Sequence, residues 1–321
     1  IKIALTGTPV ENSILELWSI FDFIMPGYLN GLSKFKEKYH ISDVDEEHLS
    51  VLDTLNKKIK PFILRRKKEE VVKDLPPKIE NNIYLDLPPL QQALYVKELT
   101  ETKEEYEQLL AQEGVYKANF KLLQLLMRLR QICIAPSILY SHYDGESIKI
   151  EKAVEVIQEQ IANGHKIVIF SSFKRVIDLL EKELRYEHIT SHKIVGGVSA
   201  KERMRMVEAF DKDDTNCFLI TLKAGGTGLN LTAADVVIHL DVWWNPQVEN
   251  QATDRTHRIG QTKPVTVIRF ITRGTIEERI IELQNKKKIL SEHLIEGHQE
   301  ATTLTSLSEE EMRNLLQYDK E

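Results

Sequence analysis

Cysteine, membrane-length apolar runs and secretion signals are what this sequence has least of. The 321 residues include only two cysteines, Cys133 and Cys217, which lie far apart and lack the spacing of a metal site. Such sparse cysteine is typical of a reducing compartment rather than of a disulfide-stabilised secreted domain. No apolar run approaches the roughly 18 residues of a membrane helix, and no signal-peptide pattern opens the chain. We therefore expect no membrane partner.

A phosphate-binding loop is also missing. None of the fourteen glycines precedes a lysine, so the pattern G-x-x-x-x-G-K-[ST] does not occur. Without that loop, the chain should not hydrolyse ATP by itself. The chain starts at Ile1 without Met, inside an apolar run, and we expect it to be a piece cut from a longer protein.

Two further features say little about partners. The net charge of −6 does not indicate a nucleic-acid-binding protein, but bulk charge is a weak guide where contacts are local. His188 and His192 are four residues apart, yet no helix with acidic or cysteine partners surrounds them. We therefore expect no metal site on this chain.

The most informative stretch covers residues 221–261. The apolar run CFLIT, Cys217 to Thr221, predicts a buried strand, and the glycine-rich sequence KAGGTG follows it almost at once. Glycines without Cβ let backbone N–H groups approach a phosphate, and Lys223 and Thr227 can add a charge and a hydroxyl. An ordinary glycine-rich turn is the alternative.

Two arginines follow a second apolar run, DVVIHLD at 235–241. The sequence WWNP closes that run, and Pro246 suits the first turn of a helix that we expect at 246–258. Arg255 and Arg258 are three apart, so they would share one face of this helix. Such a pair is usually solvated surface. At the tip of a strand-to-helix unit it can also serve as an arginine finger, because a permanently charged fork can meet charge on a phosphoryl group.

Apolar strands alternate with helices from about residue 151 to residue 272. We expect helices at 151–163, 174–186, 199–211 and 246–258, and strands at 166–171, 192–195, 217–221, 235–241 and 265–271. This alternation predicts an α/β fold in which helix layers sandwich a parallel sheet. Ligands bind such sheets at the carboxyl ends of the strands. Several polar or flexible residues fall at these ends: Ser171, Ser172, Lys223, Gly225–Gly228 and Asp241.

Helices are also expected outside this alternating region. Their predicted ranges are 13–25, 91–113, 118–133 and 274–296. The apolar stripe of the third range, Leu122, Leu125, Leu126 and Leu129, indicates core packing.

The motifs together resemble those of the Swi/Snf-type ATPases of helicase superfamily two. The sequences AGGTGLNLTAAD, WWNP and QATDRTHRIGQ are similar to the fifth and sixth helicase motifs of that family. IALTGTP, Ile3 to Pro9, resembles the third motif, and VIFSSF, Val168 to Phe173, resembles the fourth. The polar run DRTHRIGQ is the most specific of these. The likeness covers nearly the whole chain except about the last twenty residues.

The resemblance implies the C-terminal half of a double-stranded DNA translocase. The implied fold is a RecA-like parallel sheet with an N-terminal helical protrusion and a C-terminal brace helix. The corresponding limits are 1–85 for the end of the first-lobe motif plus the protrusion, 86–150 for a helical linker region, 151–273 for the second RecA-like lobe, and 274–321 for the brace helix and tail. ATP and Mg²⁺ would be held mainly by the missing N-terminal RecA-like lobe.

The resemblance also implies roles for individual residues. Arg255 and Arg258 would be the catalytic arginine fingers. Nucleotide contacts are implied for Gln251, Asp254, Gly228 and Asn230. Contacts to the phosphates of one DNA strand are implied for Ser171, Ser172, Lys174, Thr221, Lys223, Gly225, Gly226, Thr227 and Trp244.

Two other functions remain open at this point. The chain could be a non-catalytic module that docks on RNA polymerase or another DNA-bound complex, or part of a strand-separating or RNA helicase. The run DRTHRIGQ and the protrusion favour the translocase. We expect a cytoplasmic, nucleoid-associated protein if the source is bacterial and a nuclear protein if it is eukaryotic.

Overall fold

The computed structural model describes residues 2–6, 14–39, 46–64, 72, 74–113, 115–225, 228–294 and 314–317. The chain divides into two compact units, which are residues 1–71 with 282–307 and residues 72–281 with 308–321. Nowhere in these described ranges does a helix have the length and apolar character that crossing a membrane requires.

In the N-terminal part of the first unit, the described residues form three helices around a small apolar core. They are α1 (Ile14–Ile24), α2 (Leu32–Tyr39) and α3 (Glu46–Ile59), followed by the 3₁₀ turn η1 (Lys60–Phe62). Gly27 allows the turn after α1, because its φ of +80° is a left-handed conformation that glycine adopts without strain. Residues 2–6 have no regular secondary structure, and Leu5 is 96% exposed. The remainder of the third-motif sequence IALTGTP, residues 7–9, lies outside the described residues.

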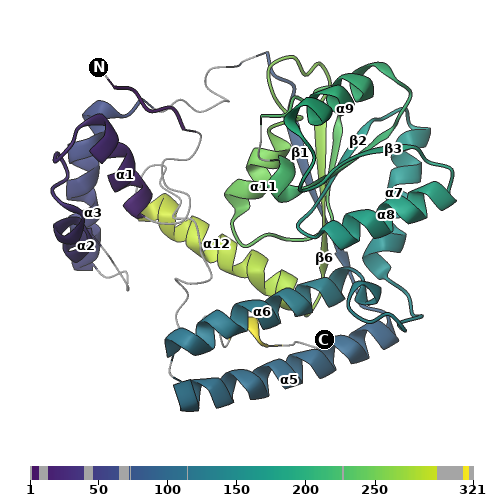
Figure 1. The fold of residues 1–321 in the computed structure, drawn as a ribbon, viewed down its shortest axis with the longest axis horizontal. Helices are drawn as coiled ribbons and strands as arrows, with labels where there is room; N and C mark the ends of the chain where they lie inside the picture. Colours follow the sequence, from purple (N-terminus) through teal and green to yellow (C-terminus); the bar gives the residue numbers. More distant parts are fainter. Residues whose placement is uncertain are drawn as a thin grey trace. The chain divides into compact units, whose positions relative to one another are not determined.

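The second unit is built on a parallel six-stranded sheet in the order β1-β6-β5-β2-β4-β3 (Figure 1). The strands are β1 (Lys78–Leu85), β2 (Ile167–Ser171), β3 (Ser191–Ile194), β4 (Cys217–Thr221), β5 (Val236–His239) and β6 (Val265–Thr272). β2 lies between β4 and β5, and all three are buried along their whole length. Burial on both faces explains why these strands read as continuous apolar runs.

Helices cover both faces of this sheet. Ile167 and Ile169 of β2 share one core cluster with α7 (Ile148–Ala162) and α8 (Lys174–Tyr186). Val168 and Phe170 point to the other face, in a cluster with α9 (Ala200–Lys212) and α11 (Pro246–Thr253). This alternation follows the two-residue period of a strand. The predicted α/β fold class, a parallel sheet between helix layers, is therefore confirmed.

Two long helices, α5 (Pro89–Glu113) and α6 (Val115–Ile134), pack lengthwise against each other (Figure 1). The buried amide of Gln91 on α5 donates to the carbonyl of Ile132 on α6 over 2.7 Å. The remaining elements are the 3₁₀ turn η2 (Pro136–Ile138), the single turn α10 (Leu222–Gly225) and α12 (Ile276–Leu294).

The sequence analysis missed β1, whose residues it grouped with the N-terminal segment. β1 pairs only with β6 among the described strands, and most of its residues are exposed. An edge strand need not carry an apolar pattern, and KIENNIYL has none. Its attachment is partly polar, since Arg269 of β6 donates to Glu80 over 2.8 Å.

The domain limits around residues 85 and 150 stay predictions.

Candidate functional site

Of the predicted contact residues at the end of β2, Lys174 is exposed and Ser171 is buried. Ser171 is 0% exposed, and its Oγ accepts the backbone N–H of Phe173 over 3.2 Å. This hydroxyl is engaged inside the fold, and the predicted contact of Ser171 with a DNA strand stays a prediction. Lys174 begins α8 with 63% of its side chain exposed, and its pair with Asp178 at 3.4 Å is a weak surface interaction. Its ammonium group remains accessible.

The end of β4 carries the glycine-rich loop. Lys223 is exposed, and no hydrogen bond or ion pair links its side chain to any other described residue. Thr221 is only 6% exposed, and Gly225 is buried against the ring of Phe170, where an added Cβ would lie 2.9 Å from Cε1. Packing therefore favours a glycine at this position, and the phosphate contacts of Thr221 and Gly225 stay predictions. Two other predicted residues lie outside the described residues: Gly226 and Thr227.

The loop continues toward the arginine segment. Gly228 has a positive φ of +52°, and both Gly228 and Asn230 are exposed. The next residue, Leu231, donates its N–H to the carbonyl of Arg255 over 2.9 Å. The structure thus brings two predicted nucleotide-contacting residues next to a predicted arginine finger.

The helix that precedes the arginines begins where the sequence predicted. Asn245 caps α11, with its Oδ1 accepting the N–H of Gln247 over 2.9 Å, and Pro246 occupies the first turn. Pro246 loses nothing there because the first N–H groups of a helix have no helical acceptor. The predicted end at residue 258 is wrong, however, since α11 ends at Thr253.

Beyond Thr253 the chain leaves the helix, and its carbonyls take other partners. The carbonyl of Arg255 accepts from Leu231, and the carbonyl of Thr256 accepts from the side-chain amide of Gln261 over 3.3 Å. The same amide donates to the carbonyl of Ala234 over 2.7 Å. These hydrogen bonds link the arginine segment to residues 231–234, which precede β5. The two arginines lie in a hydrogen-bonded loop and do not share a helix face.

The side chains of this loop are partly accessible. Arg255, Arg258 and Gln251 are half-buried, and Asp254 is exposed. Among the residues that the structure describes, none forms a hydrogen bond or ion pair with the side chain of Arg258. A half-buried, unpaired guanidinium of this kind can bind an oxyanion with charge-assisted hydrogen bonds.

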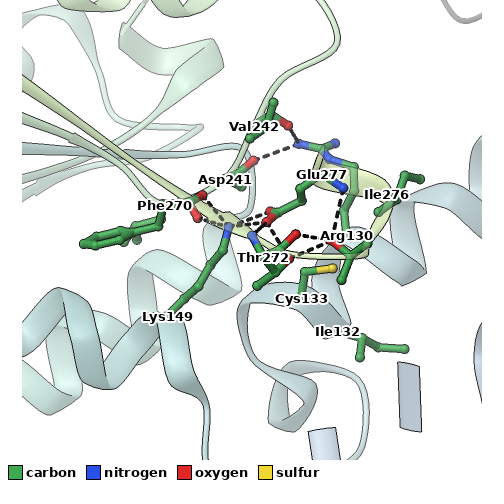
Figure 2. Close-up of polar contacts among 12 residues, drawn as sticks. Arg130, Ile132, Cys133, Lys149, Asp241, Val242, Phe270, Thr272, Ile276 and Glu277 are labelled. Carbon is green, nitrogen blue, oxygen red and sulfur yellow. Dashed lines mark hydrogen bonds and ion pairs between the residues drawn. The ribbon is translucent and has the colours of Figure 1, made fainter. Parts of the chain in front are cut away.

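A buried arginine that the sequence analysis missed lies beneath these loops (Figure 2). Arg130 of α6 is 0% exposed, and its Nη2 donates to Asp241 Oδ2 over 2.8 Å and to the carbonyl of Val242 over 2.7 Å. Asp241 Oδ1 accepts the N–H of Ser172 over 2.9 Å. Ser172 itself is half-buried, and its Oγ is 3.3 Å from Arg130 Nη2. One ion pair therefore joins the ends of β2 and β5.

Three aromatic rings surround the Arg130 guanidinium. Its central carbon lies 5.2 Å from the ring centroid of Phe173, 5.1 Å from that of Trp243 and 5.8 Å from that of Trp244. Trp244 is 7% exposed, so it packs inside this cluster, and its contact with DNA stays a prediction. The only sequence signal for the cluster is a charged residue beside the apolar stripe of α6.

A second buried ion pair supports the ends of β5 and β6 (Figure 2). Lys149 and Glu277 are both 0% exposed and lie 2.6 Å apart. The Lys149 ammonium also donates to the carbonyls of Leu240 and Phe270, and Glu277 accepts from the backbone and hydroxyl of Thr272. All three ammonium protons have acceptors, which is what a buried charge requires.

Two titratable groups of the sheet are held in one charge state by their surroundings. Burial lowers the pKa of His239 to about 3, so this imidazole is neutral at pH 7. Burial acts against the charged form of Glu80, but hydrogen bonds from Lys78 and Arg269 outweigh it and lower the pKa of Glu80 to about 2. Both groups serve to hold elements together rather than to transfer protons.

The chain fits only part of a site for a magnesium nucleotide. In the described part of the chain, no group of three or more His, Cys, Asp or Glu side chains is arranged to hold a metal ion. Guanidinium donors for a phosphate are present in Arg255 and Arg258. The residues therefore suit the phosphate end of a nucleotide and not the coordination of its metal.

Comparison with known proteins gives a consistent result. Residues 1–138 match the SNF2-related domain, and residues 148–260 match the helicase conserved C-terminal domain. An uncharacterized ATP-dependent helicase of Mycoplasma pneumoniae is 42% identical over 98% of this chain and 30% of its own length. The chain spans only 30 to 34% of the length of such bacterial relatives.

Two solved structures from Sulfolobus solfataricus are similar over most of the chain. The SWI2/SNF2 ATPase core in complex with double-stranded DNA is 34% identical, with a TM-score of 0.64, over 99% of this chain and 67% of that one. The SWI2/SNF2 ATPase C-terminal domain is 30% identical, with a TM-score of 0.61, over 76% of this chain and 100% of that one.

Proposed function

The chain belongs to the SWI2/SNF2 family of ATPases, and on that premise we propose that it supplies the second RecA-like lobe of an ATP-dependent translocase on double-stranded DNA. Its part in the whole protein would be to grip the DNA backbone and to complete the ATP site. ATP and its Mg²⁺ would be held mainly by a first RecA-like lobe of the same protein.

The observation that carries the DNA-binding part is the position of Lys223. Its ammonium group is exposed at the carboxyl end of β4 and has no acidic partner among the described residues. Lys174 is exposed at the carboxyl end of β2, the strand paired with β4. Two cations at neighbouring strand ends suit the phosphates of one strand, and phosphate contacts give affinity without sequence preference.

The nucleotide part depends on the arginine loop. Arg258 is half-buried and unpaired within the described ranges, and Arg255 is hydrogen-bonded through its carbonyl to the loop that contains Asn230. We propose that both arginines meet the phosphates of ATP held by the first lobe, and that Gln251, Asp254, Gly228 and Asn230 line this side of the nucleotide. Arginine is suited to that task because its charge is permanent and its donors are planar.

A binding measurement on the chain itself tests the DNA-backbone contact. Lys223→Ala should weaken binding to labelled duplex DNA evenly across several sequences, and it should reduce the slope of log K against log salt by about one. Fluorescence anisotropy between low and moderate salt gives both quantities. Lys182→Ala is the matched control, because Lys182 is an exposed lysine farther along α8 and should change neither.

The outcomes separate the proposed function from its alternatives. A loss of affinity for one sequence only would argue against a phosphate contact. Binding confined to single strands or RNA would favour a strand-separating or RNA helicase. Absence of binding to any nucleic acid would favour a docking module for RNA polymerase or another DNA-bound complex.

A further inference from the structure

Arg130 combines features that stability alone does not account for. It is a fully buried cation that contacts two different strand ends, yet its Nε and Nη1 have no hydrogen-bond partner among the described residues. Buried ion pairs are often replaceable by apolar side chains without loss of stability, and unsatisfied buried donors are costly. A purely structural demand at this position would be met more cheaply by an apolar residue.

The groups that Arg130 contacts lie in the chain just before the predicted DNA-contacting and nucleotide-contacting segments. On one side, Asp241 links it to the N–H of Ser172, two residues before the exposed Lys174 that begins α8. On the other side, it holds the carbonyl of Val242 and packs on the tryptophans that lead into the cap of α11. A single guanidinium therefore sets the relative position of the loop after β2 and the loop after β5.

Its geometry is specific to arginine. One nitrogen, Nη2, reaches three oxygen atoms at 2.7, 2.8 and 3.3 Å, while the planar group lies among three aromatic rings. A lysine could place one nitrogen near the same oxygen atoms, but its tetrahedral ammonium group lacks the planar face that packs on the rings. Arg130→Lys therefore separates charge from geometry.

We propose that Arg130 is a positioning residue. It fixes the position of the Lys174 loop relative to the Trp243–Trp244 loop, so that the DNA-contacting and nucleotide-contacting groups of the proposed function move together. The expected effect on DNA binding rests on the proposed function, but the relative position of the two loops can be measured without it. Through Arg130, α6 contacts both loops, and α6 also packs along α5.

The test uses the whole chain with Trp18→Phe, so that emission comes only from Trp243 and Trp244. Arg130→Lys should increase acrylamide quenching of these tryptophans and weaken duplex DNA binding by about tenfold, a usual size for coupling between sites. In the chain with Arg130, duplex DNA should shift the tryptophan emission, and this shift should disappear in Arg130→Lys. Circular dichroism should show the same helical content and melting for both proteins.

A charge-neutral pair of substitutions covers the case in which Arg130→Lys unfolds. In Arg130→Met with Asp241→Asn, no lone charge is buried, and the Asn oxygen can still accept the Ser172 N–H. This variant should remain folded and show the same losses. Arg128→Met with Glu98→Gln is the matched control, because it removes an ion pair between the half-exposed Arg128 of the same helix and the buried Glu98 of α5, and it should alter neither quenching nor DNA affinity.

The possible results decide separate questions. If the unsubstituted chain does not bind DNA, the proposed function fails, while the quenching comparison still reports on Arg130. If Arg130→Lys or the neutral pair folds with unchanged quenching and unchanged DNA affinity, Arg130 is a structural ion and the inference is overturned. Equal losses in the Arg128 control would overturn it as well, since any disturbance of α6 would then suffice.

Discussion

At the scale of single residues, the two cysteines are chemically protected by the fold. Cys133 and Cys217 are both 0% exposed, and burial raises the pKa of each thiol to about 12. Because the thiolate is the reactive form, neither should react with a disulfide reagent at pH 8 in the native chain. We expect close to no thiol release within minutes in native buffer, and two thiols per chain in guanidinium chloride.

If a thiol does react in the native chain, single replacements identify which cysteine it belongs to. Cys133→Ala and Cys217→Ala should each release one thiol after unfolding and none before it. Fast labelling of a native thiol would show that α6 or β4 opens more readily than its packing implies.

His239 makes stability depend on pH. The folded imidazole has a pKa of about 3 because it is buried, with Arg269 adding to the shift, while the ordinary value is 6.5. The unfolded chain therefore binds a proton below pH 6.5 that the folded chain does not, so stability falls as pH drops from 6.5 toward 3. At pH 5 the loss should be about 2 kcal/mol from this group alone.

Urea unfolding at pH 7 and pH 5 measures the effect of His239. His239→Gln can still hydrogen-bond the hydroxyl of Thr253, which lies 3.0 Å from the imidazole, but it does not titrate. Its stability should change less between the two pH values, by about 2 kcal/mol. Identical pH dependence in both proteins would mean that His239 is protonated in the fold.

At the scale of elements, the sequence predicted what burial dictates and missed what hydrogen bonds and edges dictate. The strands β2, β4 and β6 were predicted to within about a residue, because burial on both faces forces continuous apolar runs. The edge strand β1 was not predicted, because most of its residues are exposed and it has no continuous apolar run. The end of α11 was not predicted because the residues after it are held by segments outside the helix, as by the hydrogen bond from the N–H of Leu231 to the carbonyl of Arg255.

The candidate site was predictable in the same uneven way. Parallel topology places polar residues after each strand at one edge, so the positions of Lys174 and Lys223 followed from sequence. Which side chains face outward did not follow, and Ser171 and Trp244 proved to be buried. Arg130 comes from a helix more than 100 residues before its partner Asp241, and no local pattern encodes such a pairing.

Gln261 should be the residue on which the arginine loop depends most. Its buried amide donates to three carbonyls, and its oxygen accepts two backbone N–H groups. Gln261→Leu keeps the volume but leaves these groups unsatisfied, so we expect a loss of about 2–4 kcal/mol in urea unfolding. Gln158→Leu on the exposed face of α7 should cost less than about 0.5 kcal/mol. A loss no larger than this control would mean that water replaces the amide.

At the scale of the whole molecule, the net charge of −6 bears on how the chain meets DNA. A chain of the same sign as the phosphate backbone gains no long-range attraction, so affinity must come from a few local cations. Lys174 and Lys223 fit this pattern, and so does a division of labour in which another lobe of the protein contributes further contacts.

That division leads to a prediction about catalysis. The chain alone should hydrolyse no ATP above background, because it has no phosphate-binding loop. In a longer protein that includes the ATP-binding lobe, duplex DNA should stimulate hydrolysis, and Arg258→Ala should lower that turnover by about 10³-fold, as loss of an arginine finger does. DNA affinity should stay within about twofold, because we propose that Arg258 contacts the nucleotide and not the DNA phosphates.

The control for Arg258 is an arginine of equal charge outside both sites. Arg185 lies at the end of α8 with 78% of its side chain exposed, and Arg185→Ala should leave turnover and DNA affinity unchanged. Lys223→Ala should give the complementary result, with weaker DNA binding but unchanged turnover at saturating DNA. If Arg258→Ala instead raised only the DNA concentration needed for half-maximal rate, this arginine would be a DNA contact. Hydrolysis by the isolated chain would contradict the prediction that it needs the ATP-binding lobe.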